Sequence, residues 1–166
     1  MRPLLPLLVL LAPVCLLQAE PVNGFGVTVG GVSASQGGLN SAGGSLGVDT
    51  QFAVNASWSL NPYLMVSLEK ATATSQKVSD NLGGIQFRRW AGPVYFGPQI
   101  FFHDRLLING GQVVSSQYGP GAGVVLGWEG ARGWSMGAQL DALEAQFLNT
   151  VDRRNAVRVY LGYRWH

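Results

Sequence analysis

Residues 46–60 read LGVDTQFAVNASWSL, and apolar side chains alternate with small or polar ones along the whole stretch. Leu46, Phe52 and Val54 fall on one face, and Asp49 falls on the other. A period of two residues is typical of a β-strand with one apolar face. The stretch is longer than the mean soluble strand of about 5–6 residues, and a tilted membrane-crossing strand needs roughly 9–11. The sequence therefore predicts a membrane-crossing strand in which Val54 faces lipid.

The same alternation predicts seven further strands, and hence an all-β fold. These strands are expected at about residues 24–35, 64–69, 82–90, 94–107, 113–128, 134–147 and 157–165. Tight turns are expected at 61–62, 91–93 and 129–133, and longer polar connections at 36–45, 75–80, 108–112 and 149–154. Short periplasmic turns and longer outer loops are typical of transmembrane barrels. The prediction is an eight-stranded antiparallel transmembrane up-and-down β-barrel in a bacterial outer membrane, with both termini periplasmic.

The N-terminal residues predict an exported chain. Arg2 gives a positive start, residues 4–17 are mostly apolar, and Ala19 follows as a small residue. This arrangement is typical of a secretory signal peptide, and the apolar run is too short for a spanning helix. We expect 1–19 to be the signal peptide and 20–166 to form one barrel domain.

Composition agrees with a membrane barrel and excludes a nucleic-acid-binding surface. Charged residues make up 12% of the chain, against roughly 25% in soluble domains. Without Arg2, ten Lys and Arg stand against nine Asp and Glu, so the basic balance of a nucleic-acid-binding protein is missing. Cys15, the only cysteine, lies within the expected signal peptide. We therefore expect no disulfide, no thiolate metal site and no cofactor.

The tryptophans give a separate indication of the membrane boundary. All five lie near an expected periplasmic turn or at the C-terminus: Trp58, Trp90, Trp128, Trp134 and Trp165. Aromatic residues gather at the interfaces of transmembrane barrels. The sequence therefore predicts an aromatic girdle at the periplasmic interface.

The strand count, the loop asymmetry and the terminal strand from Val157 to Trp165 together resemble the small eight-stranded outer-membrane barrels, the group of outer membrane proteins A, X and W. The resemblance covers the whole mature chain. It implies outer-membrane lipids and the barrel-assembly machinery as partners, because the C-terminal strand is similar to the assembly signal of such proteins. That signal normally closes on an aromatic residue, whereas His166 follows Trp165 here.

Several charged residues are expected to face the barrel interior: Asp49, Glu69, Arg88, Arg105, Asp141, Arg158 and Arg164. An eight-stranded barrel is just wide enough to be filled by side chains or to hold one small ligand. A buried charge without a partner costs several kcal/mol. The favoured interpretation is a plug of salt bridges, and the alternative is a narrow polar conduit.

A second candidate site lies beside the strand expected at 113–128, which places several glycines toward the interior. These glycines either make room for large side chains opposite or leave a real cavity. Prolines within this strand and its neighbour would interrupt the hydrogen-bond ladder, so an entrance from lipid would lie near the cavity. The residues of this candidate ligand site are Tyr95, Pro98, Phe101, His103, Gly119, Pro120, Gly121 and Gly123.

No catalytic residues are predicted. His103 is followed by Asp104, but alternation directs the two side chains to opposite faces, so Asp104 cannot orient the imidazole as a triad acid does. The favoured function is non-enzymatic: a small barrel with a role in envelope structure or surface interaction. The alternatives are a binder or narrow conduit for a small apolar or amphipathic molecule that enters beside 113–128, and an enzyme that modifies lipid A.

Overall fold

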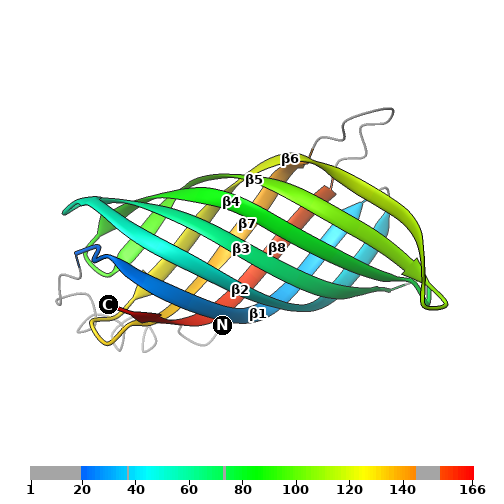
Figure 1. Cartoon of the computed structure of the whole chain (residues 1–166), viewed down its shortest axis with the longest axis horizontal. Helices are drawn as coiled ribbons and strands as arrows, with labels where there is room; N and C mark the ends of the chain where they lie inside the picture. Colours follow the sequence, from blue (N-terminus) through cyan, green and yellow to red (C-terminus); the bar gives the residue numbers. More distant parts are fainter. Residues whose placement is uncertain (1–19, 37, 73, 145–153) are drawn as a thin grey trace, which may run out of the picture.

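The computed structural model describes residues 20–36, 38–72, 74–144 and 154–166. In this part of the chain eight antiparallel strands form a closed barrel, in which each strand pairs with its sequence neighbours and the last pairs with the first (Figure 1). The strands are β1 (Gly24–Gln36), β2 (Leu39–Asn55), β3 (Trp58–Ala71), β4 (Lys77–Ala91), β5 (Val94–Asn109), β6 (Gln112–Glu129), β7 (Trp134–Glu144) and β8 (Arg154–Trp165). The predicted eight-stranded antiparallel barrel is confirmed.

None of the described residues forms a helix that is long and apolar enough to span a membrane. The expected signal peptide, residues 1–19, lies outside the described residues. We call the end at which β1 begins and β8 finishes the terminal end, because Phe25 is the cross-strand partner of Trp165 there. The opposite end, which holds the 110–111 turn, is called the mouth.

The outer surface of the barrel is an apolar belt. On β3, Leu64, Val66 and Leu68 point outward and are 64%, 53% and 57% exposed. A contiguous apolar surface of this kind is unfavourable in water, but it is the surface that a barrel presents to lipid. The next outward residue toward the mouth is Lys70, which is exposed and marks the end of the belt on this strand.

An aromatic girdle lies at the terminal end, as predicted, although not every tryptophan belongs to it. Trp165 stacks on Phe25, with 6.3 Å between ring centroids, and Tyr163 packs against both Trp165 and Trp134 at 5.0 and 5.3 Å. The expectation for Trp90 is wrong: its ring is buried inside the barrel, where Nε1 donates a hydrogen bond to Ser59. The reason is the alternation itself, because Trp90 shares the inward face of β4 with Arg88.

The turn predicted at Asn61-Pro62 is also wrong. The β2–β3 hairpin turns at residues 56–57, where the Asn55 side chain accepts a hydrogen bond of 2.9 Å from the Ser57 N–H. An Asx turn of this type needs no proline. Asn61 instead points into the barrel and donates to Gln51 at 3.0 Å. Pro62 lies on the outward side of β3; the β2–β3 pairing is interrupted at Asn61 and Pro62, whereas both residues stay paired with β4.

The long polar connection predicted at residues 36–45 is wrong as well. β1 and β2 stay paired until Gln36 meets Leu39, and the chain reverses around Gly38, whose φ of +81° suits glycine. The 75–80 connection is shorter than expected, because β4 begins at Lys77. The backbone N–H and C=O groups of these Ser- and Gly-rich segments form hydrogen bonds with neighbouring strands, so the segments are strands and not loops. Strands as long as the 18 residues of β6 exceed the roughly 9–11 needed to cross a bilayer, so the wall continues beyond the apolar belt.

The two strand prolines are farther apart than expected. Pro98 is the cross-strand partner of Val124, and Pro120 is the partner of Phe102, so four positions of β6 separate them. The β5–β6 pairing runs through both prolines without a shift of register between Val94 and Leu107. Both proline side chains are exposed on the outer face. The ladder between β5 and β6 therefore has no gap at the place where the sequence indicated one, whereas the β4–β5 ladder is interrupted at Gly97 and Pro98.

Candidate functional site: the filled lumen and the mouth cavity

The lumen contains two clusters of ion pairs, and the first lies near the terminal end. Asp49 accepts from Arg88 at 3.3 Å and from Arg164 at 2.6 Å, and Arg164 also donates to Glu129 at 3.0 Å. All four side chains are at most 6% exposed. Buried charges are tolerated when they are paired and hydrogen-bonded, and this cluster is electrically balanced.

The second cluster lies toward the mouth and is centred on Asp80. Its Oδ2 atom is 3.1 Å from both Arg154 and Arg158 and 3.5 Å from Arg105. Arg154 also pairs with Glu69, which accepts further bonds from Ser41 and Ser67, and Arg158 contacts Asp141. Among the described residues, the charged members of this cluster are three arginines and three carboxylates: Arg105, Arg154, Arg158, Glu69, Asp80 and Asp141.

Seven of the residues in these clusters were expected in the lumen from the sequence, and Asp80, Glu129 and Arg154 were not. All three were assigned to connections rather than to strands. Each nevertheless keeps the inward parity of its strand: Asp80 follows that of Arg88, and Arg154 that of Arg158. Extending each alternation past the apolar segment would have found them.

Between the clusters the lumen is packed. Tyr95 and Tyr160 share a hydrogen bond of 2.7 Å across the barrel, and the Arg88 guanidinium lies 4.4 Å from the centre of the Tyr95 ring. Gln86 donates to Gln99 at 3.0 Å and Gln99 to Asp141 at 2.6 Å, which links the middle to the mouth-side cluster. A cavity of about 20 Å³ remains beside Tyr160. That volume holds roughly one water molecule.

The inward glycines of β6 each face a large side chain of β5. The register pairs Tyr95 with Gly127, Gln99 with Gly123, Phe101 with Gly121 and His103 with Gly119. A Cβ atom on Gly127 would overlap the Tyr95 ring, and one on Gly123 would meet the backbone carbonyl of Leu140. At Gly127 the missing side chain is therefore replaced by a ring from the opposite strand.

This complementarity predicts the behaviour of Gly127→Ala. The added methyl group overlaps the Tyr95 ring, and overpacking of this kind costs about 1–3 kcal/mol. Urea titration of the barrel in lipid vesicles, followed by tryptophan fluorescence, measures the loss. Adding Tyr95→Ala should remove most of the penalty that Gly127→Ala causes in the parent background. Strictly additive effects of the two changes would show that the ring and the glycine do not share this space.

His103 is buried, and neither ring nitrogen has a hydrogen-bond partner within the part of the chain that the structure describes. Asp104 is exposed on the outer face, so the two do not form a catalytic pair. Ser115 lies opposite Leu107, four positions of β6 away from Gly119, the partner of His103. Within the described part of the chain, no group of three or more His, Cys, Asp or Glu residues suits a metal ion.

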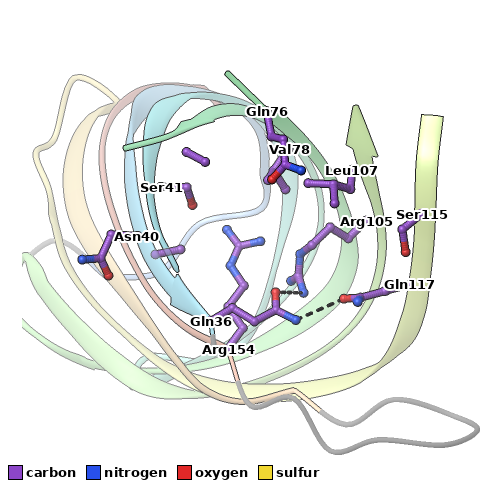
Figure 2. Close-up of a pocket in the computed structure, with 12 residues that line it drawn as sticks. Gln36, Asn40, Ser41, Gln76, Val78, Arg105, Leu107, Ser115, Gln117 and Arg154 are labelled. Atoms are coloured by element: carbon purple, nitrogen blue, oxygen red, sulfur yellow. Dashed lines mark hydrogen bonds between the residues drawn. The ribbon is translucent and has the colours of Figure 1, made fainter. Parts of the chain in front are cut away.

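An open cavity of about 240 Å³ occupies the mouth of the barrel. Figure 2 shows Arg105, Arg154 and Gln36 pointing into it. The Gln36 side chain accepts a bond of 3.3 Å from Arg105 and donates one of 3.2 Å to Gln117, so three side chains from β5, β1 and β6 form a bridge across the mouth (Figure 2). No residue of the cavity was named as a ligand contact from the sequence, because its lining comes from segments that were read mostly as loops.

No protein-family model matches the chain, and no curated protein matches it. Solved structures do match. Neisserial surface protein A is 18% identical with a TM-score of 0.67, and the match covers 86% of this chain and 95% of that one. Ail, the attachment invasion locus protein of Yersinia pestis, is 11% identical with a TM-score of 0.59 over 89% of this chain and all of Ail. A further structure shows Ail in complex with the heparin analogue sucrose octasulfate, at 11% identity and a TM-score of 0.53 over 86% of this chain and 99% of Ail.

At these identities the likeness establishes the fold. The chain has the fold of the small eight-stranded outer-membrane β-barrels, and the apolar belt and aromatic girdle are those of a transmembrane barrel. The resemblance inferred from the sequence is confirmed at this level, with no particular member singled out.

Proposed function

We propose that this protein is a non-enzymatic outer-membrane barrel that acts by surface interaction through its mouth, with both termini in the periplasm. In this proposal residues 1–19 are removed as a signal peptide, and lipids and the barrel-assembly machinery are its partners in the membrane. The observation that carries the proposal is the packing of the lumen. Two balanced ion clusters and the Tyr95–Tyr160 pair fill the interior, so interaction is left to the ends of the barrel.

The mouth is the end that suits contact with partners. The strand wall continues there past the apolar belt, and Lys70 and Lys77 face each other on its outer surface. Among the matched structures, Ail is described as an attachment protein and has been seen with a heparin analogue. A role in attachment is consistent with this arrangement.

Labelling of intact cells tests the orientation. Short epitope tags inserted after Gly38, Ser75 or Gly110, all in mouth-side connections, are expected to react with an antibody that cannot enter the cell. A tag after Gly130, in a terminal-end turn, is expected to react only after the outer membrane is opened. The reverse pattern would place the mouth in the periplasm and contradict the proposed function.

The alternative binder beside β6 makes a different prediction, because it needs an empty space at Gly121. Gly121 is the cross-strand partner of the buried Phe101. If the lumen is packed there, Gly121→Leu overpacks it and lowers the free energy of unfolding by about 1–3 kcal/mol. A stable Gly121→Leu barrel that has lost a bound lipid or detergent molecule would favour the alternative. Mass spectrometry of lipid A with and without the protein tests the enzymatic possibility, and we expect no change.

A further inference from the structure

The mouth cavity is lined by charged, hydrogen-bonding and apolar side chains. One class of ligand could contact all three kinds. Its charged lining consists of Arg105 and Arg154, whereas their partners Glu69 and Asp80 lie behind them and are at most 1% exposed. Among the described residues, the charged groups that line the cavity are therefore guanidinium groups. Planar guanidinium groups bind carboxylate, sulfate and phosphate groups through paired N–H donors.

The rest of the lining is divided between hydrogen-bonding groups and small apolar groups. Amides and hydroxyls come from Gln36, Asn40, Gln76, Gln117, Ser41 and Ser115. Apolar surface comes from Ala34, Ala71, Val78 and Leu107. A sugar ring carries hydroxyl groups at its edge and C–H groups on its faces, so it can satisfy both sets. The volume of about 240 Å³ lies below the roughly 300–1,000 Å³ of drug-sized pockets, which suits a single ring.

We propose that the mouth cavity binds an acidic sugar unit, a pyranose ring that carries one anionic group. The anion is held by Arg105, where it takes the place of the Gln36 amide oxygen, which is one of several partners of this guanidinium group. A charged acceptor makes a shorter hydrogen bond, which is about twice as strong as the bond made by a neutral acceptor. The Arg105 guanidinium group is therefore expected to prefer the anion of the ligand to the Gln36 amide. The hydroxyl groups of the ring then form hydrogen bonds with the side-chain amides of Gln36 and Gln117.

A second observation supports a ligand at this position. Arg154 is 2% exposed, and its Nε atom has no hydrogen-bond partner among the described residues, although its two terminal nitrogens are paired with Glu69 and Asp80. A buried donor without an acceptor is uncommon, and a bound group or water is one explanation of it. The positive charge of Arg154 also acts on any anion in the cavity.

The inference deepens the proposed function and rests on it for the source of the sugar, which would be a glycan met outside the cell. Binding itself does not depend on orientation. It is measured on the isolated barrel, so its failure would leave the tag-labelling result untouched. Likewise, labelling that placed the mouth in the periplasm would overturn the proposed function but not a measured affinity.

Isothermal titration of the mature barrel in phospholipid nanodiscs tests the proposal with three probes. Glucuronate carries the ring and the charge, glucose carries only the ring, and hexanoate carries only the charge. We expect glucuronate to bind at least tenfold more tightly than either of the others. Undetectable binding of glucuronate, or equal affinity for all three probes, would overturn the proposal. Free glucuronate is then compared with a short glucuronate-terminated oligosaccharide, and tighter binding of the oligosaccharide supports a glycan source.

Variants locate the site. Arg105→Gln is expected to weaken glucuronate binding at least tenfold, whereas Lys70→Gln, on the exposed outer face at the same end, should change it less than twofold. Equal losses in the two variants would show that the barrel attracts anions only nonspecifically. If Arg105→Gln does not fold, as judged by heat-modifiable migration on gels, Ser115→Tyr fills the cavity without removing a charge and should abolish binding. Unchanged binding in Ser115→Tyr would exclude the mouth cavity.

Discussion

Replacing Asp80 with alanine is expected to lower the free energy of unfolding by about 3–5 kcal/mol, the usual cost of removing one partner from a buried ion cluster. Asp80 is fully buried, and its Oδ2 atom lies within 3.5 Å of Arg105, Arg154 and Arg158. Its loss leaves three guanidinium groups together with two of their three carboxylates, in a space that water reaches poorly.

Urea titration in lipid vesicles measures this loss, and Asp104→Ala is the matched control. Asp104 also lies on a mouth-side strand segment, but its side chain is exposed on the outer face. Its removal is expected to change stability by less than about 0.5 kcal/mol, as for most surface positions. Similar effects of the two substitutions would mean that Asp80 is hydrated in the folded barrel, and the mouth-side cluster would then not be a sealed plug.

Leu64→Arg is expected to cost about 2–4 kcal/mol, because arginine on the lipid-facing side near the bilayer midplane is destabilising by that amount. Leu64 is 64% exposed and lies midway along β3 between Trp58 of the terminal end and Lys70 of the mouth. The same substitution at Val54, which lies beside the 56–57 turn, should cost only about 0–1 kcal/mol because charge is tolerated near the interface.

The comparison of these two positions is more informative than either alone. Both side chains are apolar and exposed, at 64% for Leu64 and 66% for Val54, so burial within the protein does not distinguish them. Only depth in the bilayer does. If the two arginine variants have the same free energy of unfolding in lipid, the apolar belt is not centred on Leu64. The barrel then lies at a different depth in the membrane.

The sequence predicted the wall of the barrel well because a period of two residues is imposed locally. Leu46, Leu64 and Phe96 point outward as expected, and Asp49 and Arg88 point inward as expected. Each strand carries this information in its own residues, since lipid on one side and a packed lumen on the other leave no second solution.

The ends of the strands could not be predicted in the same way, because they depend on partners that are distant in the sequence. The segment around Ser41 reads as a loop by composition, yet it is paired with β1 and β3. Asn61-Pro62 is a strong turn signal, but Asn61 is satisfied by Gln51 from the neighbouring strand. Because the turn was expected at residues 61–62, Val54 was placed closer to the middle of the bilayer than it is. The mouth cavity was missed in part for the same reason, since Gln36, Ser41 and Arg154 in its lining come from segments that were expected to be loops.

Planar-bilayer conductance tests the central claim, that the lumen is closed by its own side chains. The mid-lumen cavity of about 20 Å³ has room for roughly one water molecule, and the two ion clusters lie on either side of it. The purified barrel is therefore expected to insert without producing a steady ohmic current at any voltage that the bilayer tolerates. Asp80→Ala, if it still inserts, should produce current only through transient openings. A constant single-channel conductance of the unmodified barrel would contradict the account and favour a conduit.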